Sequence, residues 1–184
     1  MFDLSRADWK FINTFAGWFS AAGTLIVAVV ALYIANRSIR PKVRVWVGHR
    51  ISIGPGSKEP YPEFIVFGIV NQGERPLAIS QIGWKVGLLN KRHAIQQYEE
   101  SMSSKLPVYL AHGEEATWYV PLDARVQPWM EFFAKGMLMP NYKVSCLTLR
   151  AQFFSSIGQI FSVKPERTLI VKLKETCENL ARSS

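Results

Sequence analysis

The sequence has few of the residues from which catalytic and metal sites are usually assembled. It contains two cysteines and three histidines, namely Cys146, Cys177, His49, His93 and His112. The cysteines form no CxxC pair, and no histidine lies four residues from another ligand type, so a metal site of the usual local spacing is not expected. The glycine-containing segment 54–59 lacks the spacing of a phosphate-binding loop. We therefore predict no catalytic set, no metal and no cofactor, and expect that the protein is not an enzyme.

Acidic residues are outnumbered by basic residues, and the imbalance is uneven along the chain. The protein has 22 Lys and Arg against 14 Asp and Glu, for a net charge of +8, and the first 50 residues alone carry +5. A nucleic-acid surface would need a broad basic patch with stacking aromatic residues. A basic excess beside an apolar segment is instead typical of a membrane surface. We expect the lipid bilayer as a partner and no nucleic acid.

Charge is absent from residues 11–36, which read FINTFAGWFSAAGTLIVAVVALYIAN. About 20 apolar residues suffice for a helix to cross a bilayer. The pattern therefore predicts a transmembrane helix over 11–36 after a short tail at 1–10. The alternative is a cleaved signal peptide, which has a basic start and an apolar core of about 7–15 residues. The leader MFDLSRADWK is neutral overall and the apolar segment is longer than that.

The flanks of this helix predict its orientation. Two basic residues precede it, Arg6 and Lys10, whereas four follow closely, Arg37, Arg40, Lys42 and Arg44. The more basic flank stays in the cytoplasm as a rule. We therefore expect a single-pass protein of the cell inner membrane with its N-terminus outside and its C-terminal domain in the cytoplasm. The four following residues, in a basic linker at 37–42 and just after it, are expected to contact lipid.

Small side chains cluster on one side of the predicted helix. Such residues let two helices approach closely in lipid, where packing drives association. The helix-packing candidates are Ala16, Gly17, Ser20, Ala21, Thr24 and Ala28. They indicate a homo-oligomer or a membrane partner. The alternative is that small residues are simply common in membrane helices.

After Pro41 the apolar pattern changes to a period of two, which is typical of β-strands. Short apolar segments then alternate with turn residues, which indicates a β-sandwich or barrel over 43–176. Strands are predicted at 43–53, 64–70, 77–86, 106–110, 116–122, 142–154, 159–164 and 168–174. Loops are expected at 54–63 and 90–105, a short helix at 128–138, and a polar tail at 177–184.

The chain resembles a loose class of small bacterial or phage membrane proteins of unknown function. The resemblance lies in AGWFSAAGTLIVAVVALYIANRSIRPKVRV, FIVFGIVNQGERPLAISQIGW, LPVYLAHGEEATWYV and LTLRAQFFSSIGQIF, and in a turn signature at Asn71, Gly73 and Pro76. Proteins of this class pair one N-terminal transmembrane helix with an immunoglobulin-like β domain. The resemblance implies an immunoglobulin-like β-sandwich of about eight strands, and it implies no activity.

The segment PWMEFFAKGMLMP interrupts the β pattern with large aromatic and methionine side chains. Such side chains are favoured at binding surfaces. The candidates for docking a partner or the lipid interface are Trp129, Met130, Phe132, Phe133 and Met137. The alternative is a helix that closes one end of the sandwich and completes its core.

These observations favour a non-enzymatic, membrane-tethered β module that binds a protein partner at the inner face of the membrane. The first alternative is a small membrane-active effector, a toxin or phage-defence component, that oligomerises through its transmembrane helix. A second alternative is an enzyme whose catalytic residues are dispersed along the sequence.

Overall fold

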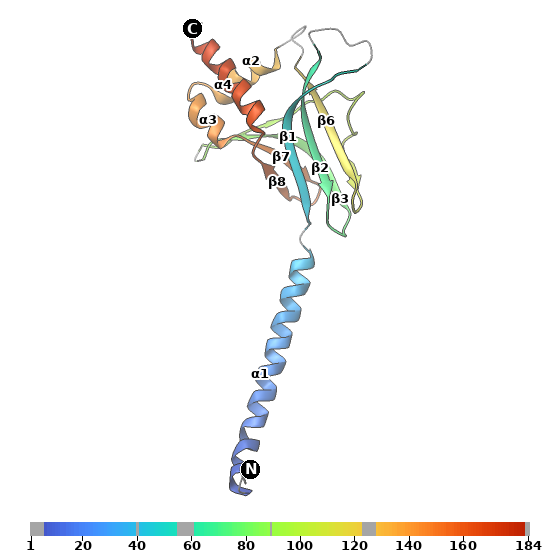
Figure 1. Ribbon diagram of the computed structural model, residues 1–184, viewed down its shortest axis with the longest axis vertical. Helices are drawn as coiled ribbons and strands as arrows, with labels where there is room; N and C mark the ends of the chain where they lie inside the picture. The colour runs from blue at the N-terminus through green and yellow to red at the C-terminus, as the bar shows by residue number, and fades with distance from the viewer. Residues whose placement is uncertain (1–5, 40, 55–60, 89, 123–127, 183–184) are drawn as a thin grey trace. The chain divides into compact units, whose positions relative to one another are not determined.

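The structure is a computed structural model that describes residues 6–39, 41–54, 61–88, 90–122 and 128–182. The chain divides into two compact units, Met1–Arg40 and Pro41–Ser184. Figure 1 shows the elements of each unit in sequence colours. The loop predicted over 54–63 lies mostly outside the described residues.

The described part of the first unit is one helix, α1 (Arg6–Ile39). Within it Thr14–Ala35 has a mean hydropathy of 2.0 over 22 residues, and none of this stretch is buried. The helix predicted over 11–36 is therefore confirmed as a helix and is longer at both ends, where Arg, Ala and Lys favour helix. Its length and composition suffice to cross a membrane, and a signal sequence meets the same two criteria.

One antiparallel sheet, sheet A, contains three strands in the order β1-β2-β6. They are β1 (Val43–Ile51), β2 (Glu63–Asn71) and β6 (Glu115–Pro121). The central strand β2 is buried along most of its length. This confirms the central strand that the continuous apolar run at 64–70 predicts, because a strand with neighbours on both sides and a covered face excludes water.

The second antiparallel sheet, sheet B, is built around β3 (Leu77–Val86). The strand β7 (Arg150–Ser155) pairs along one edge of β3 and continues the sheet to β8 (Ile160–Val163). The short strands β4 (Arg92–Ile95) and β5 (Val108–Leu110) pair with β3 one after the other. The predicted hairpin at 142–164 is thus confirmed in its second half, whereas β4 lies in the segment predicted as a loop.

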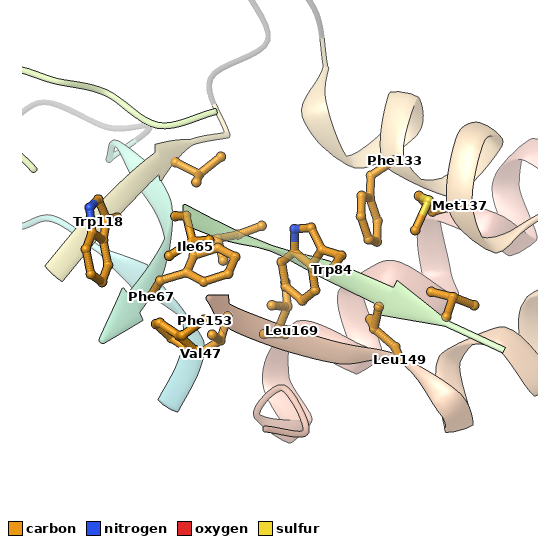
Figure 2. Packing of buried hydrophobic residues seen from close by; sticks show 14 of the residues in the cluster. Val47, Ile65, Phe67, Trp84, Trp118, Phe133, Met137, Leu149, Phe153 and Leu169 are labelled. Atoms are coloured by element: carbon orange, nitrogen blue, oxygen red, sulfur yellow. The ribbon is translucent and has the colours of Figure 1, made fainter. Parts of the chain in front are cut away.

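The two sheets share one hydrophobic core (Figure 2). The ring of Phe67 in β2 lies 5.0 Å from Trp84 in β3 and 5.9 Å from Phe153 in β7. Trp118 in β6 lies 6.1 Å from Phe153. All four side chains are essentially inaccessible to water. Each such pair contributes about 0.5–1.5 kcal/mol beyond its area burial, so these contacts hold the sheets together.

Asn71 shows why the predicted turn signature follows β2. Its buried amide donates to the carbonyl oxygens of Arg75 at 2.8 Å and Leu110 at 3.0 Å. Its Oδ1 accepts from the backbone N–H of Gly73 at 2.9 Å. The side chain therefore replaces backbone partners inside the turn, and the signature is structural.

Four helical elements complete the described part of the domain. They are α2 (Trp129–Phe133), the π-helical turn η1 (Ala134–Leu138), α3 (Tyr142–Thr148) and α4 (Arg167–Arg182). The short helix predicted at 128–138 is confirmed as α2 and η1. The strand predicted at 168–174 is wrong because this segment belongs to α4, and residues 177–182, predicted as tail, are its last turns. Residues 142–148 are helical as well, which places Cys146 in a helix rather than a strand.

The period of burial explains α4. Leu169, Leu173 and Cys177 are fully buried at spacings of four residues, which is one face of a helix. The alternation of apolar and polar residues at 168–174 also fits a strand, and only the apolar positions beyond Lys174 distinguish the two.

Candidate functional site

An apolar groove of about 650 Å³ lies between the helical turns α2–η1 and the chain that leaves β4. Its apolar lining includes Trp84, Ile95, Trp129, Phe132, Phe133 and Met137. Residues 96–99 supply most of the polar groups. A cavity of this size with apolar walls and few polar groups is typical of a binding site. We call it the α2–β4 groove.

The helical wall of the groove combines core and surface residues. Phe133 and Met137 are 5% and 9% exposed, and the ring of Phe133 lies 5.2 Å from Trp84 and stacks on Trp129 at 4.6 Å. Figure 2 shows Phe133 pointing toward Trp84 in the core. Phe132, by contrast, is 68% exposed. Within this segment, one phenylalanine completes the core and its neighbour is left for solvent or a partner.

The opposite wall is held in place by hydrogen bonds from both sheets. The indole N–H of Trp84 donates to Oε1 of the buried Gln96 at 2.7 Å. The backbone N–H of Gln96 donates to Ile82 in β3, and that of Glu99 donates to Tyr119 in β6, each at 2.9 Å. This segment thus connects sheet B to sheet A and is fixed before any ligand arrives.

The strand β4 gives the groove an open edge. It is the terminal strand of sheet B, and among the described strands it pairs only with β3. Ile95 at its end is 69% exposed and faces the groove. An outer strand presents backbone N–H and C=O groups that another chain can pair with. The groove therefore offers an apolar surface and a strand edge side by side.

The other residues predicted from sequence lie elsewhere in the chain. The small residues of α1 that were predicted to pack helices are all exposed, and Thr24 donates its hydroxyl to the carbonyl of Ser20 at 2.9 Å. Lys42 and Arg44, predicted to contact lipid, are exposed near the start of β1. The side chains of Arg37 and Arg40 lie outside those that the structure describes. Helix packing and lipid contact stay predictions.

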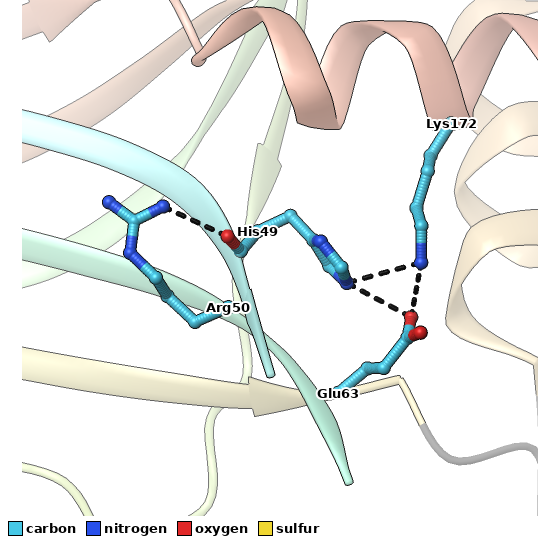
Figure 3. Close-up of polar contacts among 4 residues, drawn as sticks. All are labelled: His49, Arg50, Glu63 and Lys172. Carbon is cyan, nitrogen blue, oxygen red and sulfur yellow. Dashed lines mark hydrogen bonds and ion pairs between the residues drawn. The ribbon is translucent and has the colours of Figure 1, made fainter. Parts of the chain in front are cut away.

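A polar cluster that sequence reasoning missed joins α4 to sheet A (Figure 3). His49 Nε2 lies 2.9 Å from Glu63 Oε2 and 3.2 Å from Lys172 Nζ, and Lys172 forms an ion pair with Glu63. Hydrogen bonding from Lys172, supported by His49, lowers the pKa of Glu63 below its usual value. These residues are 14 to 123 positions apart in sequence, so no local spacing could have revealed them.

A second ion pair holds the beginning of α4. The guanidinium of Arg50 donates to both carboxylate oxygens of Glu166, at 2.6 and 2.7 Å. This bidentate contact lowers the pKa of Glu166 and raises that of Arg50. Both pairs therefore hold α4 against the end of sheet A at which β1 finishes and β2 begins. None of these side chains lines the α2–β4 groove, so the polar cluster acts here as a structural contact.

Other reactive groups are unfavourably placed for chemistry. Burial raises the pKa of both thiols, that of Cys177 to about 11, and a nucleophilic cysteine needs the opposite shift. Among the described residues, no group of three or more His, Cys, Asp or Glu side chains could hold a metal ion. His93 and His112 contact Gln152 and the carbonyl of Gly73, respectively.

Comparisons with known proteins identify no family. No family model matches the chain, and no curated protein matches it. Among solved structures, a Bordetella pertussis protein described by the name ApaA shows 16% identity over 68% of this chain and 89% of its own, with a TM-score of 0.30. A structural-genomics target solved by X-ray diffraction shows 15% identity over 67% and 82%, with a TM-score of 0.29. Similarity this low assigns neither fold family nor function.

Proposed function

We propose that this protein is a non-enzymatic, membrane-tethered β domain that binds a protein partner at the inner face of the membrane. The α2–β4 groove carries the proposal, because it combines an exposed Phe132 with a preformed apolar floor and an open strand edge. These features suit an extended apolar segment of the partner, which would pair with β4 and place side chains in the groove. The helix α1 would keep the domain at the membrane.

Site-specific photo-crosslinking in the full chain tests this function. A photoreactive phenylalanine analogue replaces Phe132 in the groove, or Tyr109 in β5 as a control of similar exposure, 75% against 68%. We expect a recurring covalent adduct in membranes only from position 132. A second arm places the analogue at Ile95 and adds Phe132→Ser, which should abolish the adduct without changing the melting temperature. Equal adducts from positions 132 and 109, or none from either, would contradict the proposal.

A second candidate function rests on α1. All side chains described in this helix are exposed, including the small residues at 16, 20, 24 and 28. An effector that assembles through this surface would perturb the bilayer. Replacing Ala16, Ser20 and Thr24 with Leu should then abolish both cross-linked oligomers and any loss of membrane potential on overexpression. Unchanged potential and growth with the natural sequence would reject this candidate.

We also propose that the two sheets form an immunoglobulin-like sandwich, as the resemblance implies. The support is their antiparallel pairing and their shared aromatic core. An experimental structure in which the sheets cross at about −30° would agree with this arrangement, whereas a crossing near 90° would define an orthogonal packing and reject it.

A further inference from the structure

A second recess, of about 490 Å³, lies between α3 and α4 and is separate from the α2–β4 groove. Its apolar lining comes from Leu147, Pro165, Ile170 and Val171. Three basic residues line it as well, namely Lys164, Arg167 and Lys174. We call it the α3–α4 recess. No residue of this recess was singled out for binding by the sequence, because the recess forms only when the segment from Arg167 onward folds as the helix α4 beside α3.

The charge of the recess is positive and is not neutralised locally. Among the described residues that line it, three are cationic and none is acidic. Glu166 lies between Lys164 and Arg167 in sequence, but both of its carboxylate oxygens are occupied by Arg50. Glu178 follows Lys174 one helical turn later, beyond the lining residues. The first turn of α4 adds a partial positive charge at the same place. The site therefore favours an anion.

The rim of the recess is apolar and open to solvent. Leu147 in α3 is 63% exposed and Val171 in α4 is 43% exposed, and both line the recess. Adjacent apolar side chains on a surface mark a site of interaction. Lysine and arginine side chains beside such residues can contact the apolar region with their stems and place their charges at a headgroup. The recess thus matches a ligand that is anionic at one end and apolar at the other.

We propose that the α3–α4 recess binds an anionic phospholipid, with the phosphate at Lys164, Arg167 and Lys174 and the first part of an acyl chain on Leu147 and Val171. This inference rests on the proposed membrane tether, which would give the recess a permanent supply of lipid. An inorganic anion would leave the apolar rim uncovered. A neutral lipid would leave the three cations unpaired. The ligand class is therefore set by both features together.

The test uses the full chain in neutral detergent, titrated with short-chain phosphatidylglycerol or phosphatidylcholine and followed by native mass spectrometry. Each cation contributes about fivefold to the affinity for an anionic lipid, so three give a preference of roughly 100-fold. Replacing Lys164, Arg167 and Lys174 with Gln should bring the preference close to one. The matched control replaces Arg75, Lys91 and Lys105, exposed basic residues elsewhere in the domain, and should keep the preference.

Two further arms make the outcome decisive. The change Val171→Ser retains all three cations and should weaken phosphatidylglycerol binding while leaving any binding of inorganic phosphate unchanged. If inorganic phosphate or an acidic peptide competes as well as the lipid does, the recess is an anion or protein site and the proposal is overturned. Equal lipid preference in both triple variants overturns it too. The assay needs no partner, so its failure leaves the photo-crosslinking result at Phe132 standing, and the reverse also holds.

Discussion

At the scale of single residues, two partly exposed ion pairs connect α4 and the residue before it to sheet A. The side chains of Glu63 and Lys172 are 37% and 38% accessible, whereas His49 beneath them is 9% accessible. Solvent screening limits such a pair to about 0.2–1 kcal/mol. The ion pairs therefore define where α4 lies on the sheet. The buried leucines of α4 contribute most of the free energy that holds the helix against the core.

The lowered pKa of Glu63 gives the domain a specific acid dependence. Because the native state favours the carboxylate, its stabilisation is complete above the unfolded pKa of about 4.3 and disappears as the pH falls through the lower native value. We expect Lys172→Met to lower the free energy of unfolding at pH 7 by about 0.5–1 kcal/mol. The difference from the natural sequence should shrink as the pH falls below the unfolded pKa, as measured by urea unfolding at a series of acidic pH values. A constant difference across this range, or an equal effect of Lys91→Met, would contradict the assignment.

Cys177 makes the stability of the domain depend on pH in the alkaline range, where stability should fall as the pH rises. Burial, with smaller contributions from Cys146 and Glu178, raises its pKa to about 11. The unfolded thiol ionises near pH 8.5, so stability should fall by up to about 1.4 kcal/mol per pH unit between these two values. We expect Cys177→Ala to be less stable at pH 7 but to show a shallower alkaline slope in urea unfolding between pH 8 and 10.5, because only Cys146 then contributes a raised thiol pKa. Identical slopes in the two proteins would show that the pKa of this thiol is the same in the folded and the unfolded state.

At the scale of elements, α2 and η1 contain one side chain that stabilises the core and a neighbouring one that is available for binding. Phe133 is buried against Trp84 and Trp129, whereas its neighbour Phe132 is mostly exposed. We expect Phe133→Ala to lower the free energy of unfolding by about 3–5 kcal/mol because it leaves a cavity. Phe132→Ser should change it by no more than about 0.5 kcal/mol. Thermal unfolding of the two variants measures both, and a large loss with Phe132→Ser would place that side chain in the core.

The same elements show how far the sequence predicts this fold. The helix at 128–138 was predictable because Pro128 directly precedes its first residue, Trp129, and the β alternation stops there. The alternation at 168–174 predicted a strand, and the buried positions Leu169, Leu173 and Cys177 reveal the helical period only over a longer window. The strand β4 was missed because it is only four residues long, mostly exposed, and flanked by polar residues, as suits an outer strand. The groove could not be predicted, because its two walls are distant in sequence.

At the scale of the whole molecule, the mainly β character of the domain followed from local patterns, but the order of strands in each sheet did not. That order depends on contacts between distant segments, such as β3 with β7, which no local pattern specifies. Local patterns likewise do not decide whether the chain stays in a membrane, since the apolar stretch of α1 is compatible with a retained anchor or a removed signal sequence.

The mass of the protein isolated from membranes separates these two outcomes. A retained anchor predicts the intact mass of the 184-residue chain, recovered only with detergent and resistant to extraction by alkaline carbonate. A chain shortened at the end of the apolar segment and released without detergent would establish a signal sequence. The membrane tether of the proposed function would then be lost, whereas the groove and the recess could still be tested in the released domain.

The orientation of the chain in the membrane can be tested as well. The four basic residues after the apolar segment, against two before it, predict a cytoplasmic C-terminus. A C-terminal fluorescent protein that matures only in the cytoplasm should therefore fluoresce, and a C-terminal phosphatase that is active only outside should stay inactive. Replacing Arg37, Arg40, Lys42 and Arg44 with Gln removes the bias and should produce a measurable fraction of inverted chains. Phosphatase activity with the natural sequence would instead place the domain outside, where Cys146 and Cys177 become disulfide candidates and partners in the envelope take precedence.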